Sequence, residues 1–176
     1  TISLEDLVKW TAVTPRDLNL HVPFIAQMAS QCEAVAEFSG RRESTIALLP
    51  CQGNIYAYND EADDHLIELA HKIVTRTPTP GTARRLNVTN VGIKRSLAQT
   101  LPEPVDLLFL DTEHNGERAV AELNFHAANV RRYIVFHDTE LFGNVGDHGS
   151  GMAIAIEEWI DSNPEWFVMH HTTKQY

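Results

Sequence analysis

Residues 105–116, VDLLFLDTEHNG, give the clearest indication of the fold. Its first six residues are almost continuously apolar, which is typical of a strand in a parallel sheet that is covered on both faces. The strand then ends in Asp111, and Glu113 and His114 follow, whose side chains can exchange protons or bind metal ions. We therefore expect a buried strand that brings reactive groups to one edge of a sheet.

A second stretch, RRYIVFHDTELFG (131–143), has the same arrangement. An apolar run is again followed by polar side chains, here His137, Asp138 and Glu140. In open parallel sheets, ligands bind outside the carboxyl ends of the strands. The two stretches together predict an active site at the carboxyl edge of such a sheet.

Strand and helix patterns alternate around these two stretches. Strands are expected at 32–38, 54–59, 84–91, 105–111, 131–138 and 165–171. Helices are expected at 3–10, 14–30, 44–49, 62–74, 116–130 and 152–160, with loops at 77–82 and 139–151. The alternation predicts an α/β fold, a Rossmann-like open, mostly parallel sheet with helices on both faces and N-terminal helices added. We expect a single domain over residues 1–176, with residues 1–31 as the helical extension.

The composition is that of an ordinary soluble globular protein. A chain of 176 residues can form one domain with a core, and 43% hydrophobic and 22% charged residues are usual values. No apolar run approaches the roughly 20 residues that span a bilayer. The acidic, amphipathic N-terminus does not resemble a secretory signal. We expect a cytoplasmic protein with no membrane partner.

The net charge and the cysteines limit the class of partner and the compartment. The chain has 24 acidic and 14 basic residues and a formal net charge of −10, which argues against a nucleic-acid backbone as the partner. The same excess leaves carboxylates available to hold a divalent cation. Cys32 and Cys51 form no CxxC motif, so a reduced, intracellular chain is expected. A disulfide between them is the less favoured alternative.

Asp111 and Asp138 are the candidate metal ligands. Each closes an apolar strand, and one crossover helix separates the two strands, so the strands are expected to be neighbours in the sheet. Their carboxylates could then share a cation such as Mg²⁺, which prefers oxygen ligands. His137 or Glu140 could add a ligand. The alternative is that each aspartate caps the turn or helix that follows it.

His114 lies three residues beyond Asp111 and is the candidate catalytic base. A histidine near a cation can take a proton from a substrate hydroxyl, whereas the alternative is a surface loop histidine. His126 falls within a predicted helix and is expected to be structural. His170 and His171 are not expected to be ligands. The glycine-rich loop at 139–151 could close over a substrate or simply be mobile.

The turn after the first predicted strand, EFSGRREST (37–45), lies where nucleotide-binding folds approach their ligand. Such turns carry glycines so that the backbone can come close to the ligand, and here Gly40 is the only one. Ser44 or Thr45 could cap the helix that follows. At the end of the second strand, Asp60 could hydrogen-bond ribose hydroxyls or cap the next helix.

The motifs together resemble a known family. The order AEFSGRRESTIALL, IYAYND, DLLFLDTEHNGERAVAEL, YIVFHDTELFG and GMAIAIEEWI is similar to that of class I S-adenosylmethionine-dependent methyltransferases. In particular, it resembles the metal-dependent sugar O-methyltransferases that share a fold with cephalosporin hydroxylase-like proteins. The resemblance covers roughly residues 30–170, and DLLFLDTEH and YIVFHDT are its strongest parts.

The resemblance implies S-adenosylmethionine as the cofactor, Mg²⁺ as an assisting cation and a sugar-like small molecule as the acceptor. It implies cofactor contacts at Glu37, Gly40, Asp60 and Asp111, metal ligands at Asp111, His137 and Asp138, and a general base at His114. The cation would bind adjacent oxygens of a diol and lower the pKa of a hydroxyl. His114 would remove the proton, and the oxygen would attack the methyl group in line, aided by proximity and orientation.

The chain also departs from the pattern of this family. Relatives carry E-x-G-x-x-x-G in the first turn, whereas this chain has Ser39 at the first glycine and Glu43 near the second. Two alternatives follow: a degenerate Rossmann-like binding or scaffold protein without cofactor, and a metal-dependent hydrolase or hydroxylase-like enzyme. The resemblance also implies that the last antiparallel strand is shortened or missing. Trp159, Trp166 and Phe167 are assigned to the core, with the face of a homo-oligomer as the alternative.

Overall fold

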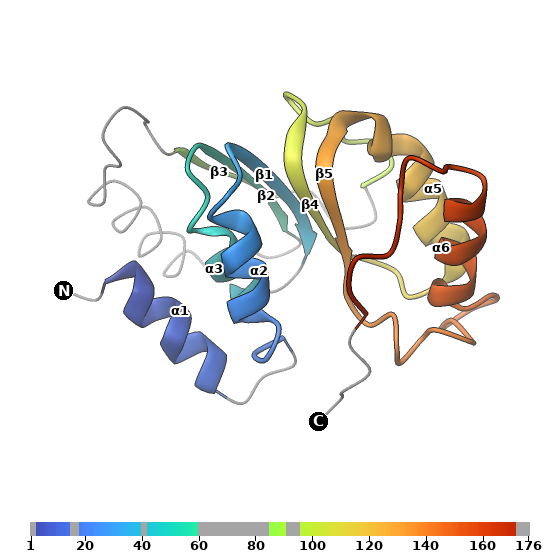
Figure 1. Ribbon diagram of the computed structural model, residues 1–176, viewed down its shortest axis with the longest axis horizontal. Coiled ribbons are helices and arrows are strands. Elements are labelled where there is room, and N and C mark those ends of the chain that lie inside the picture. Colours follow the sequence, from blue (N-terminus) through green and yellow to red (C-terminus); the bar gives the residue numbers. More distant parts are fainter. Residues whose placement is uncertain (1–2, 15–17, 40–41, 60–84, 91–95, 172–176) are drawn as a thin grey trace.

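The computed structural model describes residues 3–14, 18–39, 42–59, 85–90 and 96–171 (Figure 1). The predicted helix at 62–74 and the predicted loop at 77–82 lie outside the described residues. So do two of the predicted cofactor residues, Gly40 and Asp60.

The centre of the fold is a five-stranded sheet in the order β3-β2-β1-β4-β5. The strands are β1 (Ala34–Ser39), β2 (Asn54–Asn59), β3 (Arg85–Asn90), β4 (Val105–Asp111) and β5 (Val130–Phe136). All four neighbouring pairs are parallel, which confirms the predicted Rossmann-like α/β fold. The strand order reverses between the neighbouring strands β1 and β4, so the carboxyl ends of these two strands flank the expected ligand crevice.

Helices cover both faces of the sheet (Figure 1). They are α1 (Leu4–Val13), α2 (Val22–Ala29), α3 (Arg42–Leu48), α5 (Gly116–His126) and α6 (Met152–Asp161), and the 3-10 turn η2 (Ala127–Asn129) follows α5. The first three helices lie on one side, and α5 and α6 lie on the other. None of the helices in the described part of the chain is long and apolar enough to cross a membrane.

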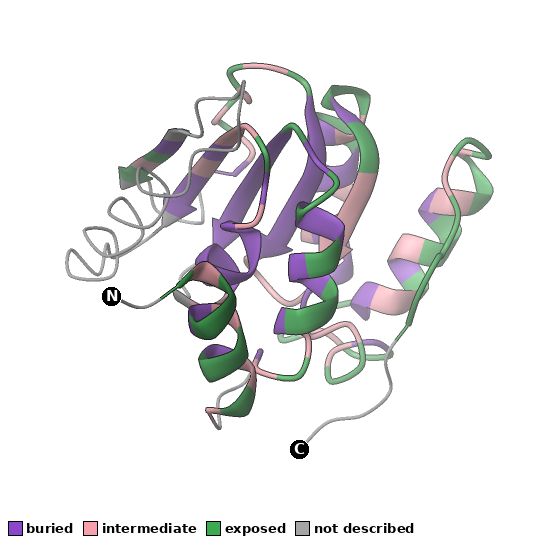
Figure 2. Ribbon diagram, turned by 60° about the vertical axis from the view of Figure 1, so that its left-hand side comes forward, coloured by how far each residue is buried: buried purple, intermediate pink, exposed green. Residues whose placement is uncertain are grey.

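The two central strands are buried along their whole length (Figure 2). Successive side chains of a strand point to opposite faces, so one strand contributes to two cores. Val35 and Phe109 lie in the cluster that includes Ile46 of α3, whereas Phe38 and Leu108 lie in the second cluster. This double coverage explains why VDLLFLD is an apolar run and not an alternating one.

The second helix begins later than predicted. The sequence pattern places its start at Thr14, but residues 18–21 form turns and α2 begins at Val22. The Asn19 side chain donates a hydrogen bond to the Ala12 carbonyl, which ties this turn back to α1. Pro23 lies in the first turn of α2, where its missing N–H costs nothing and its fixed φ suits a helix.

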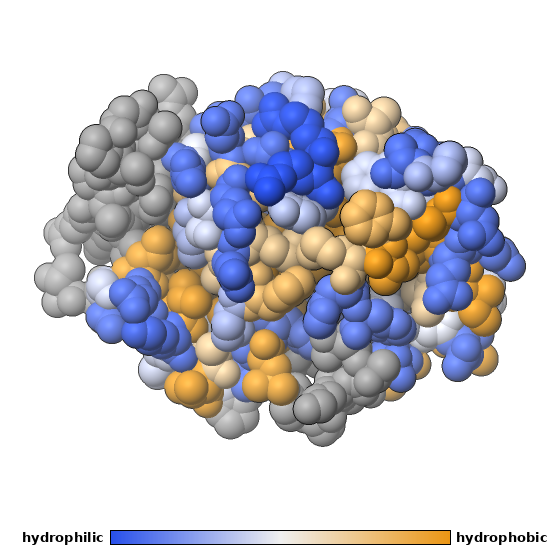
Figure 3. Space-filling model, in the orientation of Figure 1, coloured by the Kyte–Doolittle hydropathy of each residue, from blue (hydrophilic) through white to orange (hydrophobic). Residues whose placement is uncertain are grey.

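The predicted final strand at 165–171 is absent, because this segment pairs with no neighbouring strand. Phe167, Val168 and Met169 are more than half exposed, so the assignment of Phe167 to the core is wrong. Figure 3 shows hydrophobic surface between β5 and α6. Trp159 is buried as predicted, and the partly buried Trp166 packs against the core beside it, with 6.4 Å between the two ring centroids.

Candidate active site

The ends of β4 and β5 bring Asp111 and Asp138 to one edge of the sheet. The two strands are parallel neighbours, with Leu110 opposite Phe136, as the sequence predicts. The His137 N–H extends the pairing by donating to the Leu110 carbonyl at 3.0 Å. The two aspartates therefore follow adjacent, rigid strands that are held in a fixed register.

Asp138 has an unusual backbone conformation for its type. Its φ is +57°, and no other non-glycine residue in the described ranges has a positive φ. Residues other than glycine rarely adopt this left-handed backbone conformation, although aspartate tolerates it better than most. The Phe142 N–H donates to the Asp138 carbonyl at 3.0 Å and closes the turn. Such strain is concentrated at functional sites.

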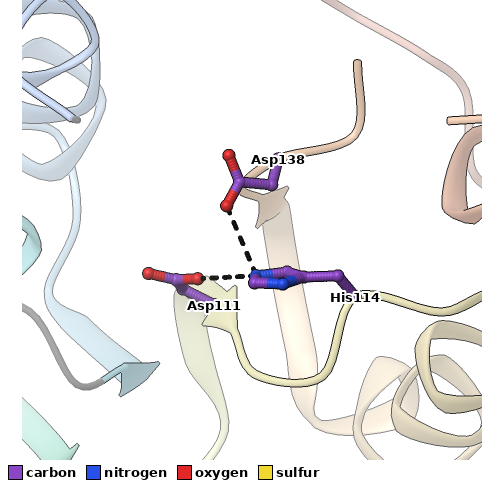
Figure 4. A group of neighbouring side chains, drawn as sticks. All are labelled: Asp111, His114 and Asp138. Atoms are coloured by element: carbon purple, nitrogen blue, oxygen red, sulfur yellow. Dashed lines mark hydrogen bonds and ion pairs between the residues drawn. The ribbon is translucent and has the colours of Figure 1, made fainter. Parts of the chain in front are cut away.

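His114 faces both aspartates from the loop between β4 and α5 (Figure 4). Its Nε2 lies 3.5 Å from Asp111 Oδ1 and 3.3 Å from Asp138 Oδ2. The Asn115 side chain caps α5 by accepting from the Arg118 N–H at 2.8 Å, which anchors the end of the loop. The imidazole stacks on Phe142, with 4.5 Å between centroids and 5° between planes. Its Nε2 edge is thus fixed toward the two carboxylates.

The glycine-rich loop packs against His114 from the other side. Asp147 Oδ2 lies 3.3 Å from His114 Nδ1, and the Asp147 N–H donates to the His114 carbonyl at 2.8 Å. A Cβ at Gly146 would lie 2.8 Å from that carbonyl oxygen and 2.8 Å from the Asn115 Cα, so only glycine permits this approach. Sequence reasoning missed Asp147, although an acid among glycines was a visible signal. His148 is exposed.

His137 faces the same two carboxylates from a buried position. Its Nδ1 lies 3.1 Å from Asp138 Oδ2 and 3.8 Å from Asp111 Oδ1. The ring is 7% exposed, and its Nδ1 has no hydrogen-bond partner with acceptable geometry. The ring packs between His21 and Phe109, with centroid distances of 6.1 Å and 6.5 Å. Two imidazoles therefore converge on one pair of carboxylates.

The charges in this cluster shift one another's titration. Burial opposes the charged form of His137, but the nearby carboxylates of Asp111 and Asp138 outweigh it and raise the pKa of His137 to about 9. The interaction with Asp111 raises the pKa of His114 despite its partial burial. Burial would raise the pKa of Asp138, but His137 and the charge of His114 lower it below its usual value. The cluster therefore favours a negatively charged Asp138 together with positively charged His114 and His137.

Ligand atoms of Asp111, His114 and Asp138 all lie within 4.8 Å of one another, close enough to share a metal ion. Glu140, a further predicted candidate, pairs with His171 at 3.3 Å. His126 is structural, as predicted: it is buried and its Nε2 lies 2.8 Å from the Ser96 carbonyl.

Glu37 is a second buried acid near the switch point of the sheet. Its Oε1 accepts from the Thr45 hydroxyl, while its Oε2 is buried without a hydrogen-bond partner. Burial raises the pKa of Glu37 to about 7, although hydrogen bonds from Ser44 and Thr45 oppose the shift, and the charge of Asp111 adds to it. Ser44 and Thr45 lie inside α3, so they bind Glu37 and do not cap the helix as predicted.

Glu122 supports the loop below the cluster. It is 1% exposed on α5, and both of its carboxylate oxygens accept from the Thr112 hydroxyl, at 2.8 Å and 3.0 Å. Arg118 donates to Glu122 at 2.8 Å and to the Ser96 hydroxyl at 2.7 Å. Because Thr112 follows Asp111 directly, the network holds the end of β4 in place. Glu122 was not singled out from the sequence. Its position next to Leu123, which was expected to face the core, was the one indication that it could be buried.

An open cavity of about 1370 Å³ lies beside the cluster. It is bounded by α2, β5, α6 and the segment 165–171, and its lining includes His137 and Asp138. Most of its lining is apolar, including Phe24, Phe136 and Trp166. Charged side chains such as Arg132 and Glu157 also line it. Mainly apolar clefts that carry some polar groups are typical of small-molecule sites.

Comparisons with known proteins support the fold alone. No protein-family model matches the chain, and no curated protein matches it. Among solved structures, it is similar to the crystal structure of cofactor-bound Rv0187 from MTB, with a TM-score of 0.55 and 23% identity. The similarity covers 93% of this chain and 76% of that chain. It agrees with the Rossmann-like arrangement of the sheet.

Proposed function

We propose that this protein is an S-adenosylmethionine-dependent O-methyltransferase that acts on a sugar-like hydroxylated small molecule with the help of a divalent cation. One observation carries the proposal: Asp111, His114 and Asp138 converge at the carboxyl edge of β4 and β5. The family resemblance of the sequence and the cofactor-bound neighbour in fold support it. The adjoining cavity offers room for the acceptor.

The residues present fit a cation. Asp111 and Asp138 offer carboxylate oxygens from adjacent strands, and His114 lies within the same 4.8 Å group. The buried Nδ1 of His137 has no hydrogen-bond partner and faces the same oxygens. A buried nitrogen that faces two carboxylate oxygens offers, together with them, the kind of donor atoms that hold a metal ion in proteins. Asp111, Asp138 and His137 would hold the ion.

The residues of the first turn fit a cofactor that carries an ammonium group. The free Oε2 of Glu37 is buried at the end of β1, where Rossmann-like folds bind their cofactors. A positive group beside it would favour the charged carboxylate and return its pKa toward the usual range. When bound, S-adenosylmethionine would supply the methyl group, and the cation would lower the pKa of the acceptor hydroxyl.

His114 is suited to accept the hydroxyl proton. Its Nδ1 faces Asp147, so Nε2 is the nitrogen directed toward the reacting edge. The Asp147 carboxylate would fix the tautomer and stabilise the imidazolium that forms, in the same way as the aspartate of a hydrolase triad. Stacking on Phe142 keeps the ring in this orientation. Together these contacts pre-organise the base before substrate binds.

One observation favours a second candidate, a metal-dependent enzyme without this cofactor. The first turn satisfies several of its own polar groups: the Ser44 hydroxyl donates to the Ser39 hydroxyl at 3.1 Å, and Thr45 donates to Glu37. Ser39 is fully buried where the related methyltransferases carry a glycine. A side chain there could occupy space that the cofactor needs.

Isothermal titration calorimetry with S-adenosylhomocysteine, with and without a divalent cation, tests the proposal. We expect micromolar binding that Glu37→Ala weakens at least tenfold, whereas Glu33→Ala, an exposed acid just before β1, leaves the affinity unchanged. No binding by the folded wild-type protein would contradict the methyltransferase proposal and favour the metal-only enzyme.

A further inference from the structure

The candidate metal site contains more nitrogen than a magnesium site needs. Two imidazole atoms, His114 Nε2 and His137 Nδ1, approach the same carboxylate oxygens of Asp111 and Asp138 at distances from 3.1 Å to 3.8 Å. The donor atoms available to an ion are therefore two oxygens and two nitrogens. Neither cysteine belongs to the cluster. Their thiols donate hydrogen bonds to the backbone carbonyls of Met28, Cys32 and Asn54.

His137 is the residue that adds a nitrogen donor to the two carboxylates of the candidate metal site. Its side chain is more than nine-tenths buried, and its Nδ1 has no hydrogen-bond partner although two acidic side chains lie next to it. The position of the ring is imposed by the fold, since the His137 N–H is bonded to Leu110 of β4 and the next residue has a positive φ. A metal ion in front of Nδ1 would take the place of the proton on this nitrogen and would bind the two adjacent carboxylates as well.

His114 could also be a metal ligand, but its contacts do not distinguish a metal ligand from a general base. Its second nitrogen faces Asp147 at 3.3 Å, and metal-ligating histidines usually direct their other nitrogen to a carboxylate in this way. The same arrangement suits a general base. The inference therefore rests on His137, and His114 remains available for the proton transfer proposed above.

The mixed donor set indicates which class of ion fits. Mg²⁺ prefers six oxygen ligands in a regular octahedron and loses its waters reluctantly. Imidazole nitrogen suits the first-row transition metals, and affinity for mixed nitrogen and oxygen sites rises along that series. We propose that Asp111, Asp138 and His137 bind a first-row transition dication, such as Mn²⁺, Fe²⁺, Co²⁺ or Zn²⁺, in preference to Mg²⁺. This inference rests on the proposed function only in using the same metal site.

Direct binding measurements on the full chain test the preference without any activity assay. Titration of the metal-free protein with MnCl₂, CoCl₂ and MgCl₂ should give at least tenfold tighter binding of Mn²⁺ and Co²⁺ than of Mg²⁺. Co²⁺ also reports its ligands through its visible absorption, which changes when a nitrogen donor is lost. His137→Gln should remove most of the preference and alter the Co²⁺ spectrum.

Two further variants sharpen the test. His137→Asp supplies an oxygen donor at the same position and should narrow the gap between Mn²⁺ and Mg²⁺. His148→Gln removes an exposed histidine of the adjacent loop and should leave the affinities and the spectrum unchanged. The thermal unfolding of each metal-free variant, compared with the wild type, confirms that the protein is folded.

Three outcomes would overturn the inference. Mg²⁺ binding as tightly as Mn²⁺ would show that nitrogen donors do not control the site. An unchanged Co²⁺ spectrum in His137→Gln would remove His137 from the ligand set. A folded protein that binds no metal would overturn the inference together with the metal part of the proposed function, while the S-adenosylhomocysteine titration reads the cofactor part independently.

Discussion

Glu37 is a carboxylic acid placed where ionisation is unfavourable. It is fully buried on β1, one of its oxygens has no hydrogen-bond partner, and its pKa is about 7. A buried acid with a pKa near neutrality is a feature of functional sites. Burying this carboxyl group destabilises the folded protein, and it also provides an acid that a cationic ligand could contact.

Glu37→Gln should make the folded protein more stable at high pH. The folded pKa of about 7 exceeds the usual value of 4.5, so the native state binds the extra proton and loses stability as the pH rises between these values. The neutral glutamine avoids this loss. We expect a gain of about 3 kcal/mol in the free energy of unfolding at pH 8 and under about 1 kcal/mol at pH 5.

Urea unfolding of both proteins at the two pH values measures this gain. Glu33→Gln serves as the control, because Glu33 is exposed just before the same strand. An equal change at pH 5 and pH 8 would show that Glu37 does not titrate in this range.

In the proposed mechanism Asp147 is a positioning residue, because it would act through His114 and not on the substrate. Asp147→Asn keeps a polar group of the same shape at the His114 Nδ1 but removes the negative charge. We expect kcat to fall about tenfold or more, since partners of this kind usually contribute 10- to 100-fold. The affinity for S-adenosylhomocysteine and the unfolding midpoint should stay unchanged. A fall in kcat that comes with lost stability would indicate a structural role instead.

At the scale of elements, the site depends on how α5 is fixed to the end of β4. Glu122 and Arg118 lie one turn apart on α5 and bond to Thr112 and Ser96, which belong to different connections. The Arg118 and Glu122 side chains are only 12% and 1% exposed, so this ion pair is buried. The network places a helix, a strand end and a preceding turn in one arrangement.

Glu122→Ala should therefore destabilise the protein strongly. Removing one member of a buried ion pair leaves the other charge without its partner and costs about 3–5 kcal/mol. Thr112→Val removes a single hydroxyl donor to the same carboxylate and should cost about 1 kcal/mol. Chemical denaturation of the three proteins compares these values. Similar small losses in both variants would show that the pair contributes little.

At the scale of the whole molecule, the candidate cluster joins segments that are far apart in the sequence. Asp111 ends β4, His114 lies on the following loop, and His137 and Asp138 follow β5. These segments are held together by the parallel pairing of β4 and β5 and by the docked glycine-rich loop. An ion bound to all of them would stabilise the folded state, in which alone they lie together.

Metal ions should accordingly raise the thermal stability of the wild-type protein. At a free metal concentration 100 times the dissociation constant, linkage predicts a stabilisation of about 2.7 kcal/mol. Asp111→Ala and Asp138→Ala should each lose most of this gain, and addition of EDTA should reverse it. Glu113→Ala, a change in the same loop outside the cluster, is the control. A metal-induced shift that persists in both aspartate variants would place the ion elsewhere.

Much of the fold could be predicted because the apolar patterns are local. NIYAYN and VDLLFLD match β2 and β4 to the residue, and the spacing of the apolar residues predicts α6 to within one residue. The predicted cap at Ser44 or Thr45 is wrong, because α3 begins at Arg42. The exceptions have physical causes. The start of α2 depends on a side-chain contact with α1. The segment EWFVMHH resembles a strand by composition, but strand pairing requires a neighbour that composition cannot supply.

The strand pattern and the order of the elements in the chain were enough to predict the parallel sheet and to place Asp111 and Asp138 at one of its edges. The sequence also marked His114 as a candidate base. The contacts of Asp147 and Glu122 with the site, and the burial of the His137 side chain beside two carboxylates, became visible only in the folded molecule. The physical reason is that hydrogen bonding and burial depend on contacts between distant segments, which no local pattern records.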